Sequence, residues 1–270
     1  MLTEPVPAEC GWLAVQFRCG HEPGDRIVTA MPAALPTPDV PDVPDVPVTS
    51  VAGAIARMEA IGAALPAADG FACFNRMYLD VTSQVNSQLD HGFYADPAFM
   101  TQLDVNFANL YFAAADVTGN PAAVPLAWRP LAERRAEAGI EPIQFALAGM
   151  NAHINHDLPM AVVSTCTALA TSPEAGQHYA DYQKVDQLLD AAEQSIRQSF
   201  ESAPELAVDH HLRAVATLTC NWTMNSARDL AWNNSLLLWA LRDDPFERGL
   251  FMDSLAATTA AASRMLLVAV

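Results

Sequence analysis

The chain has 270 residues, 51% of them hydrophobic, which is enough to form a substantial buried core. Its 31 acidic and 14 basic residues leave a net charge of −17, which disfavours nucleic acid and anionic membrane surfaces as partners. The acidic N-terminus lacks a signal-peptide pattern, and the five scattered cysteines form no C-x-x-C pair, so we expect a cytoplasmic protein with free thiols.

Residues 1–48 differ in composition from the rest of the chain. They hold much of the proline and include three tandem Pro-Asp-Val units between Pro38 and Val46. Such a repeat cannot form a packed core, because proline removes backbone donors and the aspartates repel one another. We therefore predict a disordered tether over residues 1–48 and a single domain over residues 49–270.

From residue 49 onward, apolar residues recur every three or four positions, the spacing that predicts helices. Thr49 or Ser50 can cap the first helix, and a second is expected over about residues 71–89. Proline is favoured at the start of a helix, and four further helix starts are expected at Asp96-Pro97, Arg129-Pro130, Glu141-Pro142 and Asp244-Pro245. Other helices are expected over about residues 179–200, 206–221 and 226–242. No alternating run predicts a strand, so the fold class is all-α, an irregular bundle of about eight helices.

The helix expected after Pro142 contains a run of polar side chains, residues 151–157, between apolar flanks. His153 and Asp157 are four residues apart and share one helix face, and His156 can converge on them. A second pair at the same spacing consists of Asn151 and Asn155. Because the apolar flanks predict a buried helix, these polar side chains need partners in the core.

A His-x-x-x-Asp pair on a buried helix suits a divalent metal ion such as zinc, iron or manganese, because imidazole nitrogen and carboxylate oxygen point into one cavity. Pro159 should interrupt the helix just past Asp157 and free backbone carbonyls near the histidines. One helix rarely supplies a whole coordination shell. Asp104, at the edge of an apolar stripe, is the leading further ligand; the others are Asp90, His91, Asp186, Asp209, His210 and His211.

Three functions fit this polar run. In the first, His153 and Asp157 hold a metal ion that activates water for hydrolysis, with His156 as second ligand or general base. In the second, which needs no metal, His153 held by Asp157 is a general acid or base in an apolar cavity, suited to cyclisation, elimination or isomerisation of a small hydrophobic molecule. In the third, the polar residues only hold the core together, and the protein is a helical ligand-binding protein or scaffold.

A second candidate feature is the pair Arg228 and Trp232, which are four residues apart and could line a pocket together. The alternative is that Arg228 pairs with a buried carboxylate and Trp232 belongs to the core. Arg228 and Asp104 complete the catalytic candidates, and the substrate-binding candidates are Asn109, Tyr111, Asn151, Asn155 and Trp232. No Gly-x-Ser-x-Gly, phosphate-binding loop or dinucleotide fingerprint occurs, so we expect a small-molecule substrate and no nucleotide cofactor.

Three segments carry a family resemblance: Gly149–Pro159 with the sequence G-M-N-A-H-I-N-H-D-L-P, Leu103–Phe112, and Arg228–Trp232. Together they resemble an uncharacterised, mainly actinobacterial family catalogued as a domain of unknown function. The resemblance covers about residues 50–265 and implies a fold but no activity. The His-x-x-x-Asp pair is also similar to one in the all-helical, zinc-dependent phospholipases and nucleases, although the chain lacks the His-x-x-x-Glu partner of that group.

Overall fold

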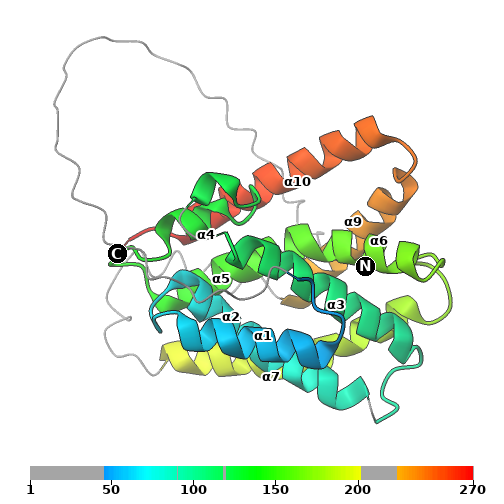
Figure 1. The fold of residues 1–270 in the computed structure, drawn as a ribbon, viewed down its shortest axis with the longest axis horizontal. Coiled ribbons are helices and arrows are strands. Elements are labelled where there is room, and N and C mark those ends of the chain that lie inside the picture. The colour runs from blue at the N-terminus through cyan, green and yellow to red at the C-terminus, as the bar shows by residue number, and fades with distance from the viewer. Residues whose placement is uncertain (1–45, 90, 118–119, 202–223, 270) are drawn as a thin grey trace, which may run out of the picture. The chain divides into compact units, whose positions relative to one another are not determined.

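The computed structural model describes residues 46–89, 91–117, 120–201 and 224–269, and for residues 190–201 only the backbone (Figure 1). These residues form helices and no strand, which confirms the predicted all-α fold. The α-helices are α1 (Val51–Ala64), α2 (Gly70–Leu89), α3 (Pro97–Ala115), α4 (Arg129–Arg134), α5 (Pro142–Ala152), α6 (Leu158–Ala168), α7 (His178–Glu201), α9 (Met224–Ala240) and α10 (Pro245–Leu266). Two shorter elements are the 3-10 turn η1 (Pro121–Ala123) and the π-turn η2 (His153–Asp157).

Several helices begin where a capping residue predicts. The Ser50 hydroxyl accepts a hydrogen bond from a backbone N–H at the start of α1, and the carboxylates of Asp96 and Asp244 do the same for α3 and α10. Proline follows each of these aspartates at the first helical position, where its missing N–H is not needed. The starts of α4 and α5 are likewise confirmed, whereas the helix predicted over residues 206–221 lies outside the described residues.

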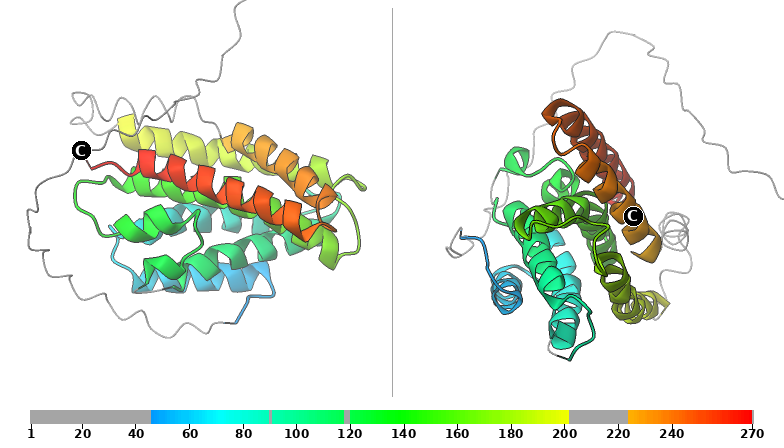
Figure 2. Two further views of the ribbon diagram at one scale, coloured as in Figure 1. Left: turned by 90° about the horizontal axis from the view of Figure 1, so that it is seen from above. Right: turned by 90° about the vertical axis from the view of Figure 1, so that its right-hand side faces the viewer.

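Helices α5 and α6 follow one another through the bundle and are joined by η2. Helix α5 packs on α2 and α10, α6 packs on α3 and α9, and η2 contacts α3, α9 and α10. The two views of Figure 2 show the green α5 and α6 with cyan helices on one side and the orange and red helices on the other. Phe145 in α5 and Val162 in α6 are fully enclosed, so the polar run 151–157 lies in the core.

Helices α2 and α5 approach closely at Gly149. A Cβ at this position would lie only 2.5 Å from Cγ of Phe74, so a larger residue would push the helices apart. Phe74 in turn packs edge-on against Tyr111 and Trp128, with ring centroids 5.1 and 5.2 Å away. The close approach therefore places an aromatic cluster beside η2.

The last residues of the predicted tether, 46–48, bind to α1 and α3. The side chain of Asn109 accepts from the N–H of Val48 at 2.9 Å and donates to its C=O at 3.0 Å. Arg57 donates to the C=O of Val46 at 3.1 Å. These bonds fix the chain just before α1, and residues 1–45 lie outside the described part.

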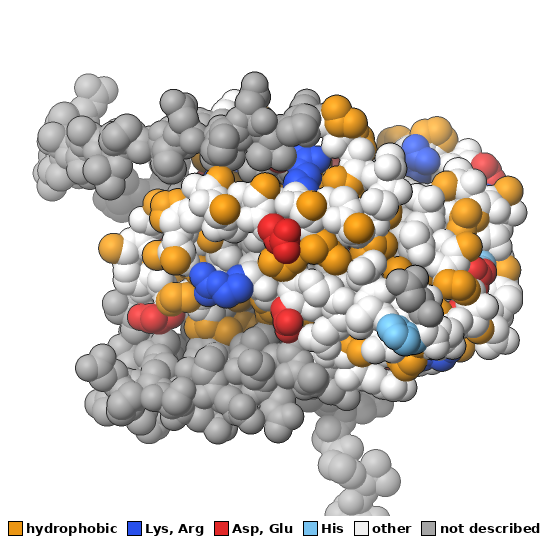
Figure 3. Space-filling view, turned by 60° about the horizontal axis from the view of Figure 1, so that its bottom comes forward, with side chains coloured by type: hydrophobic (Ala, Val, Ile, Leu, Met, Phe, Trp, Pro, Cys, Tyr) orange, Lys and Arg blue, Asp and Glu red, His pale blue; other side chains and the backbone are white. Residues whose placement is uncertain are grey.

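Among the described residues, no helix combines the length and the apolar composition needed to cross a membrane. Figure 3 shows one face of the molecule, on which hydrophobic side chains are spread among a few separate Lys, Arg, Asp and Glu side chains. The described part of that face has no broad basic patch of the kind that binds a phosphate backbone.

Candidate functional site

The polar run 151–157 covers the end of α5 and the π-turn η2, which joins α5 to α6. In η2 the N–H of Leu158 reaches the C=O of His153, five residues earlier instead of the usual four. Pro159 is the second residue of α6 and has no N–H, so the α-helical bond to Asn155 would be missing here in any case. The α-helix is interrupted at His153–Asp157, just before the position predicted from Pro159, and it resumes at Leu158. Such π-turns are rare in proteins, and those that do occur are often found at functional sites.

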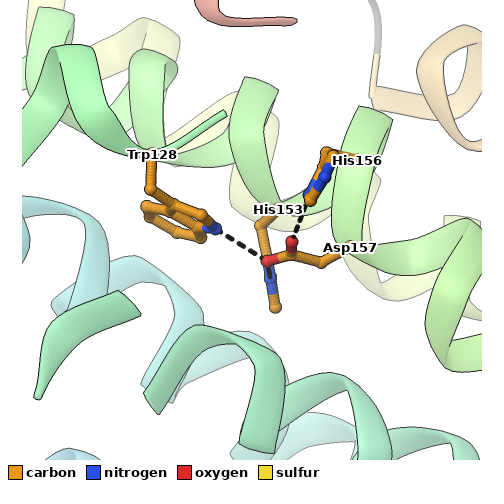
Figure 4. Close-up of polar contacts among 4 residues, drawn as sticks. All are labelled: Trp128, His153, His156 and Asp157. Carbon is orange, nitrogen blue, oxygen red and sulfur yellow. Dashed lines mark hydrogen bonds and ion pairs between the residues drawn. The ribbon is translucent and has the colours of Figure 1, made fainter. Parts of the chain in front are cut away.

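The carboxylate of Asp157 lies at the centre of this turn and accepts three hydrogen bonds (Figure 4). Nδ1 of His153 and Nε1 of Trp128 lie 3.0 and 2.8 Å from Oδ2, and Nδ1 of His156 lies 2.8 Å from Oδ1. Burial raises the pKa of Asp157, but the hydrogen bonds from the two histidines outweigh burial and hold this pKa below its ordinary value. Asp157 is therefore ionised and can only accept, so each histidine donates from Nδ1.

His153 is consequently a neutral imidazole with a free lone pair. Burial lowers the pKa of His153, and its hydrogen bond to Asp157 and the charge of Asp157 oppose burial only in part. With the proton held on Nδ1, the lone pair is on Nε2, which is buried and has no hydrogen-bond partner among the described residues. A general base requires such an oriented imidazole with an unoccupied nitrogen.

Aromatic rings fix the plane of the His153 imidazole. Phe107 of α3 stacks on it, with 3.5 Å between the ring centroids and 5° between the planes. The rings of Tyr78, Phe74 and Trp128 surround it at 4.5, 5.5 and 5.9 Å. These apolar rings exclude water from the imidazole, and this explains why burial dominates its pKa.

His153 lines a cavity between α2, α3, α7 and α9. The cavity has a volume of about 80 Å³. On the same measure one water molecule needs roughly 10–15 Å³, so the cavity has room for several. Its walls are mainly Phe, Met, Val and Leu side chains; the polar exceptions are Tyr78, Asp104, His153 and Arg228. Walls of this kind suit a small hydrophobic molecule with one polar group.

Asp104 lies in the wall of the same cavity, on α3 and one turn before Phe107. Its Oδ2 atom is buried and has no hydrogen-bond partner in the part of the chain that the structure describes. Burial raises the pKa of Asp104 to about 7. Asp104 can therefore exchange a proton near neutral pH, as a general acid or base must.

Arg228 also lines the cavity, but its guanidinium already has partners. Nε donates to Asp186 at 2.6 Å, and Nη2 donates to the C=O of Tyr182 at 2.5 Å. The guanidinium also lies 4.1 Å above the ring of Tyr182. Arg228 is thus paired with a carboxylate, the alternative considered from the sequence. Trp232 packs against Tyr182 at 4.8 Å and is not in the cavity wall, so Arg228 and Trp232 do not line the cavity together.

The other substrate-binding candidates lie outside the cavity wall: Asn109, Tyr111, Asn151 and Asn155. Asn151 donates to the C=O of Thr259 in α10, and Asn155 donates to the side chain of Asn151. The hydroxyl of Tyr111 donates to Asn75 of α2. Asn151 and Tyr111 thus join helices to one another, Asn155 holds Asn151, and Asn109 holds Val48, so the structure gives these side chains a structural role in place of the predicted contact with substrate.

Those predicted metal ligands that the structure describes do not gather around one point. No three His, Cys, Asp or Glu side chains among the described residues could together hold a metal ion. Both oxygens of Asp157 accept hydrogen bonds, and His153 and His156 turn Nδ1 towards these oxygens. Of the further candidates, His91 is exposed and Asp186 binds Arg228, while Asp90 and residues 209–211 lie outside the described residues.

Trp128 is the site residue that the sequence analysis missed. It lies in the turn before α4, 29 residues from Asp157, so no helical spacing links the two positions. The only signal is chemical, because a buried carboxylate needs several donors and tryptophan offers a neutral one. Sequence cannot show which of several tryptophans fills that place.

Comparison with known proteins places the chain in a family without assigning an activity. No curated protein and no solved structure matches it. A family model described as a family of unknown function (DUF5995) matches residues 51–269, the range that contains every helix described above. This match confirms the resemblance to an uncharacterised domain family, and the chain therefore belongs to the family of unknown function DUF5995.

Proposed function

We propose that the protein is an enzyme in which His153 removes a proton from a small hydrophobic molecule bound in the cavity. The observation that supports this most strongly is the lone pair on Nε2 of His153, which has no hydrogen-bond partner among the described residues. A purely structural histidine would have both ring nitrogens bonded, because an unpaired buried acceptor costs about 1–3 kcal/mol. Isomerisation, elimination and cyclisation are the matching reaction classes, since a base can start each of them.

The surroundings of His153 favour a base over a metal ligand, because no three His, Cys, Asp or Glu side chains among the described residues could together hold a metal ion. Asp157 holds the proton of His153 on Nδ1, and bonds from Trp128 and His156 hold Asp157 in place. A metal-dependent hydrolase would need Asp157 as a ligand, but donors occupy both of its oxygens. We therefore prefer the acid–base enzyme to the metal-dependent hydrolase and to the likeness with zinc-dependent phospholipases.

Proton removal in the cavity can be tested with 5-nitrobenzisoxazole, a small apolar compound that opens to a coloured cyanonitrophenolate when a base takes its C–H proton. We expect the wild-type protein to accelerate this reaction. His153→Gln should lower kcat/KM about a hundredfold or more, since a positioned base contributes roughly 10²–10⁴. His91→Ala, which removes an exposed histidine, should leave the rate unchanged.

Melting temperatures of both variants establish that the fold is kept. A folded His153→Gln variant that reacts as fast as the wild-type protein would overturn the proposal. Loss of the wild-type rate on dialysis against a chelator would instead favour the metal-dependent enzyme.

A further inference from the structure

Asp104, another polar side chain of the cavity wall, is a buried acid that has no counter-charge among the described residues. No ion pair or hydrogen bond to its Oδ2 occurs within the described residues. Of the described side chains in the cavity wall, Arg228 is the one cation, and its guanidinium is bound to Asp186 and to the C=O of Tyr182. An isolated carboxylate in apolar surroundings is costly, so Asp104 favours its protonated form and can donate a hydrogen bond from its O–H.

Asp104 and His153 both line the cavity, and so does Phe107, which links their positions. Phe107, three residues after Asp104 on α3, stacks on the His153 ring at 3.5 Å. Residues three apart on a helix are neighbours, with about 5–6 Å between their Cβ atoms. A molecule bound beside Phe107 can therefore meet a hydrogen-bond donor from Asp104 and the lone pair of His153 at the same time.

We infer that the substrate is an uncharged, hydrophobic carbonyl compound with a hydrogen on the carbon next to the carbonyl, and that Asp104 donates to the carbonyl oxygen. The inference rests on the proposed function of His153 as a base. A carbonyl oxygen accepts from the Asp104 acid, while the neighbouring C–H group supplies a proton to His153. A carboxylate would meet no unpaired cation in the described wall and would lie against another acid.

The proposed step needs no further reactant. Nε2 of His153 takes the proton from carbon, the C–H electron pair forms the C=C bond of an enol, and the C=O π pair moves to oxygen and takes the proton of Asp104. The imidazolium then either returns its proton to a conjugated carbon or exchanges it with solvent water before it returns one to the same carbon, and Asp104 recovers its proton from the enol. The net result is exchange of the C–H proton or migration of a double bond.

Acetophenone in D₂O tests this inference, because loss of its methyl signal in proton NMR reports exchange at the carbon next to the carbonyl. We expect the wild-type protein to accelerate exchange at least tenfold over buffer. Asp104→Leu should lower the protein-catalysed rate by about 10²–10³, the usual effect of losing a donor to a developing oxyanion. Asp104→Asn, whose amide still donates, should keep more of the rate than Asp104→Leu, a difference that a merely structural role would not produce.

The ligand class is tested by competition in the 5-nitrobenzisoxazole reaction. Acetophenone should inhibit it, whereas benzoate and benzylammonium at the same concentration should not. Stronger inhibition by benzylammonium would overturn the inference, because Asp104 would then be an ionised partner for an amine. If 5-nitrobenzisoxazole reacts but acetophenone does not exchange, the inference fails alone; if neither reacts, the proposed function fails as well.

Discussion

Asp104→Asn is expected to increase the free energy of unfolding at pH 8 by up to about 4 kcal/mol. The folded protein keeps the Asp104 proton up to about pH 7, whereas the ordinary carboxyl loses it near pH 3.8. Between these values the folded state binds more protons than the unfolded chain. The stability that Asp104 contributes is therefore complete below pH 3.8 and is lost as the pH rises to about 7.

Asparagine has the same shape and no charge at any pH, so its advantage over Asp104 should be largest at pH 8 and should vanish near pH 4. Urea unfolding at pH 4, 6 and 8 measures this difference. Asp80→Asn, which changes an exposed acid on α2, should stay within about 0.5 kcal/mol of wild type throughout. An equal gain at all three pH values, or a loss of stability at pH 8, would show that Asp104 is not a strained buried acid.

Asp157→Ala is expected to lower the free energy of unfolding at pH 7 by about 3–5 kcal/mol, the usual cost of removing one partner from a buried charged network. The substitution leaves the Nδ1 groups of His153 and His156 and the indole N–H of Trp128 without their acceptor. All three side chains are buried, so water cannot replace the carboxylate without entering the core.

The matched control is Asn155→Ala on the same π-turn. Asn155 is half-buried and donates one hydrogen bond, to Asn151, so its removal should cost only about 1 kcal/mol. Chemical unfolding of both variants at pH 7 compares the two costs. Similar small losses for Asp157→Ala and Asn155→Ala would mean that the Asp157 network does not hold the site together.

The helices could be predicted because their signals are local. Asp96 and Asp244 each supply an acceptor for free N–H groups, and the following proline already has a helical φ angle. The predicted second helix, about residues 71–89, agrees with α2 to within one residue. Because these signals do not depend on how the helices pack against one another, the sequence alone is enough to predict the helices.

The centre of the site could be predicted in part. A spacing of four placed His153 and Asp157 on one face, and they lie at hydrogen-bond distance, 3.0 Å. Asp104, selected for its place at the edge of an apolar stripe, lines the same cavity as His153. Spacing does not reveal which ring nitrogen faces which partner, so the sequence could not show that Nδ1 of His153 faces Asp157 and that Nε2 is left without a partner among the described residues.

The long-range partners could not be predicted. Asn151 bonds to Thr259, 108 residues away, and Trp128 reaches Asp157 from a turn outside the helix that carries it. A buried polar side chain bonds to whatever group the packing brings near, and the packing of distant helices is not encoded in local spacing. For this reason Asn151 was predicted as a substrate-binding residue although the structure uses it to join α10 to α5.

The protonation of His153 tests the account most directly. Proton–nitrogen correlation NMR of protein labelled with ¹⁵N-histidine, with His153→Gln to assign the signal, distinguishes the two neutral tautomers from the imidazolium. We predict a neutral ring with the proton on Nδ1 and a bare Nε2 at pH 7, which stays neutral as the pH falls through 6.5, because burial lowers the pKa of His153. An imidazolium at pH 7, or a neutral ring with the proton on Nε2, would contradict the account.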